Sequence, residues 1–246
     1  MRWQFALLLT LAGVLVVGLV SVVAALPGTV PGLDFVRRAA DERRNENTEA
    51  VVLVNGRAIT AAELAEMEQW VNANVSWMRE AEKETTDTTQ VAVLRRTREL
   101  IERSGPRTVA LARLIRDRAL ESAAIERGVW PDEATIAERV ARDRALAEQM
   151  RDPRVETYVA TFGPTVYWEQ FYPSVAAREL AEERLYEIVT GDEQDLQARQ
   201  TRWLSFEREL VRAVQIDVVK PEALGATSVD AALGYLEAYW TLHGGA

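Results

Sequence analysis

The sequence predicts a mainly α-helical domain with one small β-pairing, preceded by an N-terminal transmembrane helix. Apolar residues recur at spacings of three and four over much of residues 60–214, which is the period of amphipathic helices. Only residues 51–54 and 215–218 show the β-branched, alternating pattern of strands. Residues 5–26 carry no charged side chain and are long enough to span a bilayer.

Residues 5–26 are interpreted as an uncleaved anchor in the cell membrane, with the lipid bilayer as its partner. Arg2 and the free amine precede it, so we expect a single-pass protein with a cytoplasmic N-terminus and an extracytoplasmic main domain. A signal peptide cleaved after Ala25 is the alternative, because Val23-Ala24-Ala25 offers small residues, although the apolar stretch is longer than the usual h-region. Residues 27–49, with "PGTVPG" and "DERRNENTE", are expected to form a linker.

The helical domain is expected to begin with a strand that turns quickly into a capped helix. Residues 51–54 precede the turn signal Asn55-Gly56, and Arg57–Ile59 allow only a brief return. Thr60-Ala61-Ala62-Glu63 matches a capping box. Since an unpaired strand leaves its amides and carbonyls unsatisfied, we expect the lasting partner of 51–54 to be residues 215–218.

Periodicity and turn residues predict a series of further helices. The first helix has an apolar stripe at Leu64, Met67, Val71, Val75 and Met78, and an exposed loop at 82–90 follows it. Later helices are expected at 91–103, 107–127, 132–150, 165–190, with a kink or junction near Pro173, and 193–214. We expect the domain to cover residues 50–219, and residues 220–246 to form a C-terminal tail with a short helix at 228–242.

The composition argues against most kinds of catalytic, metal-binding and nucleic-acid-binding site. The chain has no cysteine and one histidine, His243, which excludes disulfides, thiol catalysis, zinc–cysteine sites and catalytic triads that require histidine. The net charge of −9 argues against a nucleic-acid surface. Gly56 follows a strand but lacks the further glycines and the lysine of a phosphate loop. We therefore predict no catalytic residue, no cofactor, no metal and no nucleic-acid partner.

Several motifs resemble the N-terminal domain of SurA/PrsA-type chaperones. The strand ending in Val54-Asn55-Gly56, followed by Ile59-Thr60 and a helix with Glu63, is similar to the opening of that domain. The stretch "LARLIRDRALESAAIERGVWPDEATIAERV" is similar to its middle, and "YWEQFYP" resembles a motif of membrane-anchored relatives. The resemblance covers about residues 50–219. It implies a SurA-N/trigger-factor-like helical domain that binds unfolded or extracytoplasmic polypeptides.

Many members of that family also carry a parvulin peptidyl-prolyl isomerase domain. Such a domain needs further strands, glycine-rich signatures and paired histidines, and the sequence offers none of these. We therefore expect no isomerase activity.

Aromatic and methionine side chains are the candidate binding residues, because mobile apolar surfaces suit promiscuous peptide binding. Trp70 and Trp77 lie beside the apolar stripe, and a helix cannot bury the adjacent Tyr167 and Trp168 on one narrow face. Core packing is the alternative role for each ring. The candidate peptide-binding residues are Trp70, Trp77, Met78, Trp130, Tyr167, Trp168 and Phe171.

Two functions compete at this point. The first is a membrane-anchored, chaperone-like protein that binds non-native polypeptides without catalysis. The second is a structural subunit that docks one specific partner in a membrane complex, or that forms a homodimer. A broad range of clients would favour the first function, and a single crosslinked partner would favour the second.

Overall fold

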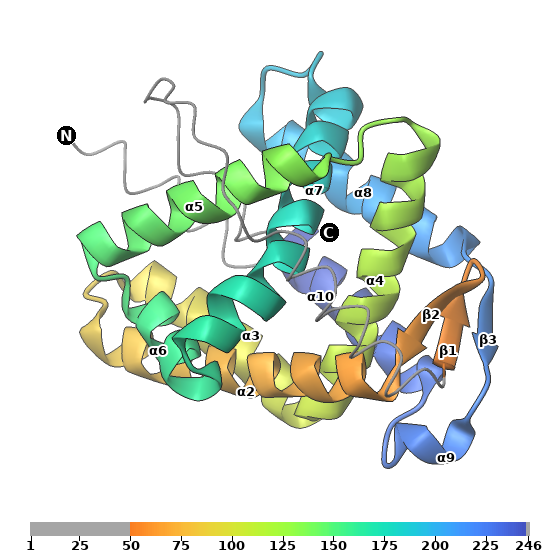
Figure 1. Cartoon of the computed structure of the whole chain (residues 1–246), viewed down its shortest axis with the longest axis horizontal. Helices are drawn as coiled ribbons and strands as arrows, with labels where there is room; N and C mark the ends of the chain where they lie inside the picture. Colours follow the sequence, from red (N-terminus) through yellow and green to blue (C-terminus); the bar gives the residue numbers. More distant parts are fainter. Residues whose placement is uncertain (1–49, 245–246) are drawn as a thin grey trace.

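The computed structural model describes residues 50–244, which form a set of packed helices with a small sheet at one side (Figure 1). The mainly α-helical prediction is therefore confirmed. Within residues 50–244 no helix is long and apolar enough to cross a membrane. The predicted anchor at 5–26 and the linker at 27–49 lie outside the described residues, so both stay predictions.

The sheet joins the start of the described chain to residues 216–218, which follow α8. Strands β1 (Ala50–Val54), β2 (Arg57–Thr60) and β3 (Ile216–Val218) are antiparallel and lie in the order β2-β1-β3. The predicted pairing of β1 with β3 is confirmed: Val52 lies opposite Val218 and Val54 opposite Ile216.

The segment after the turn is a full strand, which corrects the expectation of a brief return. Asn55 and Gly56 have φ angles of 49° and 75°. Positive φ at both central residues is the backbone of a two-residue hairpin turn that matches the twist of paired strands. Arg57–Thr60 therefore pairs with β1 along its whole length, and β1 becomes the central strand.

The first helix begins at a well-defined cap. In the predicted capping box, the Thr60 hydroxyl accepts from the Glu63 amide at 3.1 Å and the Glu63 carboxylate accepts from the Thr60 amide at 2.9 Å. In chain order the helices are α2 (Ala61–Glu84), α3 (Thr88–Ser104), α4 (Pro106–Glu126), α5 (Glu133–Met150), α6 (Pro153–Phe162), the π-helix η2 (Val166–Phe171), α7 (Tyr172–Thr190), α8 (Leu196–Ala213), α9 (Pro221–Leu224) and α10 (Val229–Gly244).

The long exposed loop predicted at 82–90 is wrong. Helix α2 continues to Glu84, and the Asp87 side chain accepts hydrogen bonds from the Thr89 and Gln90 amides and so starts α3. Polar composition alone suggested a loop, but an Asp cap supports a helix start in the same residues. The junction expected near Pro173 is confirmed, since η2 gives way to α7 at Tyr172.

Helix α4 forms the centre of the main core. It packs against α2, α7, α8 and α10, and Leu111 and Ile115 are fully buried. Arg118 forms ion pairs with Glu63 and Glu121. Ile125, in the last turn of α4, is exposed, whereas its neighbours Ala123 and Ala124 are buried.

Helix α10 belongs to the same core. Its Tyr235, Leu236 and Trp240 are buried in one cluster with the residues of α4, and α10 lies against α3, α4 and α8. The sequence pattern assigned residues 220–246 to a tail beyond the helical domain. The described part of that segment instead completes the main core.

Replacing a core residue of α10 should therefore unfold the whole domain more easily. Leu236 is 2% exposed, so Leu236→Ala should lower the free energy of unfolding by about 2–5 kcal/mol. Leu242, on the same helix but 36% exposed, is the matched control, and Leu242→Ala should cost about 0.5 kcal/mol. Urea unfolding followed by far-UV circular dichroism measures both. Equal midpoints for the two variants would show that α10 is not part of the core.

Candidate functional site

The predicted peptide-binding side chains lie in or against the core. None of them is exposed. Met78, Tyr167, Trp168 and Phe171 are buried, whereas Trp70, Trp77 and Trp130 are partly buried against core side chains.

The aromatic side chains of η2 form a second core cluster with residues of α2, α5, α6 and α7. Tyr167 and Trp168 are both buried, with ring centroids 4.8 Å apart and ring planes at 77°. Both rings are buried because neighbouring helices cover η2 on more than one side, so the two rings need not share one narrow face. Trp70 joins this cluster by stacking on Tyr158 at 5.7 Å.

Trp70 and Trp77 are each covered by an arginine, and Trp130 lies elsewhere. The Arg113 guanidinium lies 4.4 Å from the Trp70 ring centroid, and that of Arg154 lies 5.9 Å from the Trp77 centroid. Trp130 lines a cavity of only about 10 Å³ beside Glu182. The structure thus brings Trp70, Tyr167, Trp168 and Phe171 together in the second core cluster. Met78 belongs to the main core, and Trp77 and Trp130 pack against that core.

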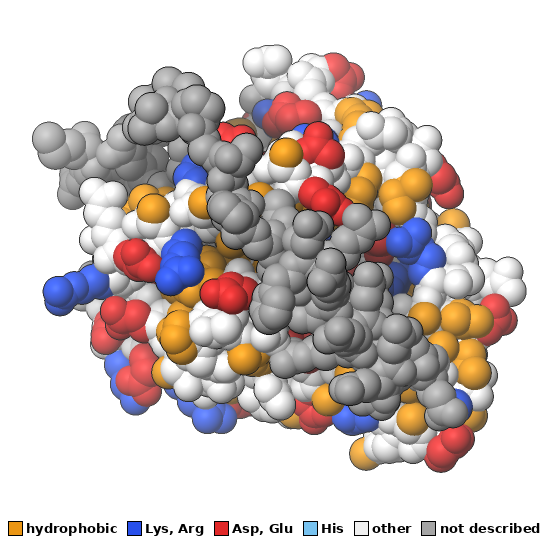
Figure 2. Space-filling view, in the orientation of Figure 1, with side chains coloured by type: hydrophobic (Ala, Val, Ile, Leu, Met, Phe, Trp, Pro, Cys, Tyr) orange, Lys and Arg blue, Asp and Glu red, His pale blue; other side chains and the backbone are white. Residues whose placement is uncertain are grey.

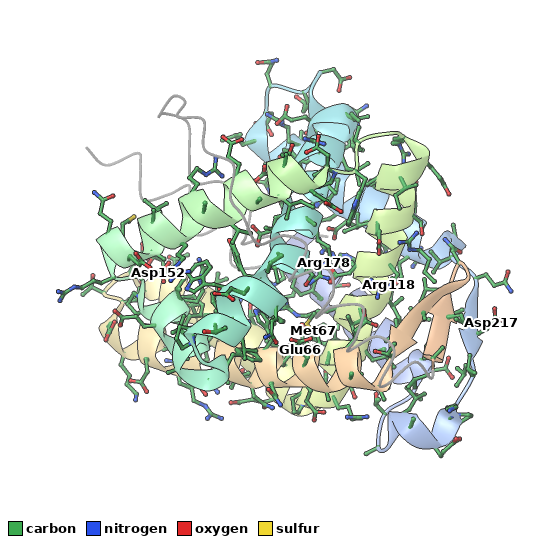
Figure 3. The ribbon with its side chains drawn as sticks, viewed as in Figure 1. Glu66, Met67, Arg118, Asp152, Arg178 and Asp217 are labelled. Carbon is green, nitrogen blue, oxygen red and sulfur yellow. The ribbon has the colours of Figure 1, made fainter. Side chains whose placement is uncertain are left out.

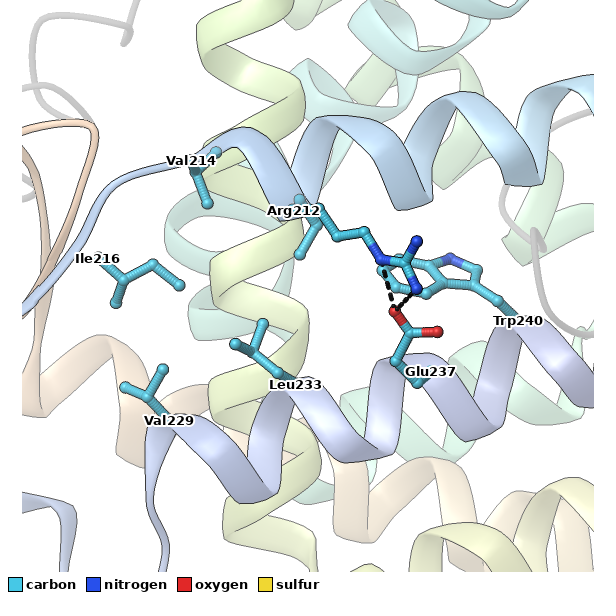
Figure 4. Close-up of a pocket in the computed structure, with 8 residues that line it drawn as sticks. Arg212, Val214, Ile216, Val229, Leu233, Glu237 and Trp240 are labelled. Carbon is cyan, nitrogen blue, oxygen red and sulfur yellow. Dashed lines mark hydrogen bonds and ion pairs between the residues drawn. The ribbon is translucent and has the colours of Figure 1, made fainter.

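A larger cavity, of about 360 Å³, lies between the end of α8, β3 and α10 (Figure 4). Most of its wall is apolar, and the Arg212 guanidinium crosses it to bond the Glu237 carboxylate at 2.8 Å. We call it the α8/β3/α10 groove. Its lining residues are Val211, Arg212, Val214, Ile216, Val229, Leu233, Glu237 and Trp240.

The indole at one end of the groove is held by a buried ionic cluster. Trp240 Nε1 donates to Glu207 Oε2 at 3.2 Å, and Glu207 is 1% exposed. Arg116 Nε donates to the same carboxylate at 3.0 Å, and a further Arg116 nitrogen bonds Glu182 at 2.6 Å. Burial raises the pKa of Glu182 to about 7, and the charge of Arg116 opposes that rise. The cluster ties α4, α7, α8 and α10 together behind the groove.

Strand β3 borders the groove, and one of its edges has no partner strand within residues 50–244. The Asn55 amide donates to the Gln215 carbonyl, and the Val219 amide donates to the Val51 carbonyl, each at 2.9 Å. Antiparallel strands bond through every second residue, so the N–H and C=O groups of Ile216 and Val218 point away from β1. Among residues 50–244 no strand pairs with that side of β3.

The side chains next to this edge are apolar. Ile216 lines the groove, and Val218 on the same face of the strand is 42% exposed. Figure 2 shows hydrophobic side chains at the surface near the sheet, at the right of the view. An accessible row of backbone donors and acceptors beside an apolar groove can bind another extended chain.

Sequence reasoning missed this site because it concentrated on aromatic residues. The available signal was the run Ile216 to Val219, with β-branched residues in the last strand of the chain. Because no strand-like segment follows these residues in the sequence, one edge of this strand has no later strand to pair with.

The described residues offer no arrangement for metal chemistry. Within residues 50–244, no three His, Asp or Glu side chains lie where they could hold a metal ion. Comparisons with protein-family models, with curated proteins and with solved structures find no match. The resemblance to SurA/PrsA-type chaperones therefore stays a prediction from the quoted motifs.

Protonation of Glu182 should make stability depend on pH. The pKa of this carboxyl is raised from 4.5 to about 7 in the folded protein, so the folded state binds the proton more tightly than the unfolded chain. Its contribution to stability is therefore complete below pH 4.5 and decreases as the pH rises toward 7. Glu182→Gln, which cannot titrate, should flatten this decrease in urea unfolding measured across the range.

The control for this prediction is Glu187→Gln, on the same helix with a side chain that is 68% exposed. It should retain the wild-type dependence of unfolding on pH. A Glu182→Gln protein with the wild-type slope would contradict the assignment.

Proposed function

We propose that this protein binds extended segments of non-native polypeptide, which add a strand to β3 and place apolar side chains in the α8/β3/α10 groove. The observation that carries the proposal is the edge of β3 that no strand of the described residues covers, directly beside that groove. Backbone hydrogen bonds do not depend on the side chains of the client, so strand addition accepts many sequences. The apolar wall favours the hydrophobic segments that folded proteins bury and non-native proteins expose.

The size of the site favours transient binding. Each backbone hydrogen bond contributes about 0.5–1.5 kcal/mol, and each large apolar side chain that becomes buried contributes about 1.5–3 kcal/mol. A strand as short as β3 and one groove support only a few such interactions, which also offset the entropy lost on association. We expect dissociation constants of about 1 µM to 1 mM, weak enough for a client to leave and fold.

The proposed location follows from the N-terminal sequence. With residues 5–26 as a membrane anchor and Arg2 on the cytoplasmic side, the domain would meet polypeptides outside the cytoplasm. The resemblance to SurA/PrsA-type chaperones supports the same role. We propose binding without catalysis, and the aromatic residues singled out in the sequence act by building the cores that hold the sheet and the groove.

Removing the backbone N–H of Val218, which points away from β1, tests whether a client strand adds to β3. In Val218→Pro the lost N–H is the one that points away from β1, so the pairing with β1 should remain. We expect at least about a tenfold loss of affinity for a permanently unfolded, reduced and alkylated protein, measured by fluorescence anisotropy. The melting temperature should change little.

The matched control is Val218→Thr, which keeps the N–H and a β-branched side chain and should bind as the wild type does. Leu233→Glu, which places a charge in the groove, should weaken binding independently of the backbone. Wild-type affinity in both Val218→Pro and Leu233→Glu would refute the proposed site. Capture of one folded partner, with no binding to unfolded proteins, would instead favour the structural role.

A further inference from the structure

Asp217 is the middle residue of β3 and is exposed at the outer margin of the sheet (Figure 3). Side chains alternate along a strand, so Asp217 lies on the face opposite Ile216 and Val218. Its carboxylate accepts a hydrogen bond from the Gln215 side-chain amide at 3.0 Å. No arginine or lysine of the described residues forms an ion pair with it.

We propose that the segments accepted by β3 carry a basic residue between two apolar residues. The inference rests on the proposed function, since it assumes that a strand adds to this edge. A residue of the added strand directly opposite Asp217 would lie on the same face, with Cβ atoms about 4.5–5.5 Å apart. A lysine or arginine there gains from the carboxylate, and a glutamate or aspartate is repelled.

The flanking residues of the added strand complete the pattern. They point to the other face, where Ile216 and Val218 lie and where the groove opens. Apolar side chains are favoured at those positions because the wall offers Val229 and Leu233. The edge therefore selects for an apolar, basic, apolar order, and the net charge of −9 attracts basic segments at longer range.

The same carboxylate opposes pairing between two copies of this chain. A two-fold symmetric, antiparallel contact between two β3 edges would place Asp217 opposite Asp217 of the second copy. Like charges directly opposite each other are unfavourable, and an exposed charge is a common protection of edge strands against self-pairing. Shifting one β3 strand by two residues relative to the other would separate the two carboxylates. Since β3 has only three residues, that shift would leave almost no paired residues between the two strands.

Three labelled peptides test the preference in the full chain. They share the same alternating flanks of valine and threonine and differ only in a central Lys, Gln or Glu. We expect the wild type to bind the Lys peptide about tenfold more tightly than the Glu peptide, with the preference weakened by salt. Asp217→Asn should reduce the difference to about twofold or less, and Asp217→Lys should reverse it.

The control variant is Asp192→Asn, which changes the net charge as Asp217→Asn does but lies in the α7–α8 connection with its side chain 75% exposed. It should keep the wild-type preference. Equal binding of all three peptides by wild type and Asp217→Asn would overturn the basic preference while leaving strand addition intact. Binding of none of the peptides would overturn the proposed function, and the preference with it.

Sedimentation velocity gives a readout that needs no client. Asp217→Val should raise the dimeric fraction relative to wild type at the same concentration, because it removes the repulsion and adds an apolar β-branched side chain at the edge. Asp192→Asn should leave the dimeric fraction unchanged. An Asp217→Val protein that self-associates no more than wild type would refute the protective role of the carboxylate.

Discussion

The pairing of β1 with β3 is the interaction on which the rest of the structure depends. It joins residues 50–54 to residues 216–218 and so brings the end of α8 back to the start of the domain. The chain then continues through α9 into α10, which packs on α4. Without this pairing, β1 would expose a row of unsatisfied backbone groups, and the groove would lose the wall formed by Ile216.

Buried charged groups link the helices around that closure. Arg116 reaches Glu182 on α7 and Glu207 on α8, and Glu207 in turn accepts from Trp240 on α10. A buried carboxylate is costly unless it is paired and hydrogen-bonded, so the cluster favours the one packing in which all partners meet. The indole of Trp240 therefore has a defined position, and the groove is formed before any ligand arrives.

The aromatic side chains of η2 and the proposed binding surface lie in different parts of this domain. The rings of η2 fill the space between α2, α5, α6 and α7, where their large apolar area contributes most to stability. The proposed binding surface relies on backbone groups of β3, small β-branched side chains and one exposed carboxylate. An edge strand that must accept clients yet avoid its own copies needs a charge such as Asp217, because the open backbone alone does not discriminate.

The sequence by itself determined most of the helices, the capping box at Thr60 and the partnership of 51–54 with 215–218, but not the start of α3 or the short helix α6. Periodicity, caps and the need to satisfy a lone strand are local or pairwise constraints, and each leaves a readable pattern. Only the tertiary structure decided that Tyr167 and Trp168 are both buried, that α10 completes the core and that the groove lies beside β3. Burial depends on how many neighbours surround a helix, and an open edge depends on the order of strands in a sheet, and neither is encoded in the periodicity of a single segment.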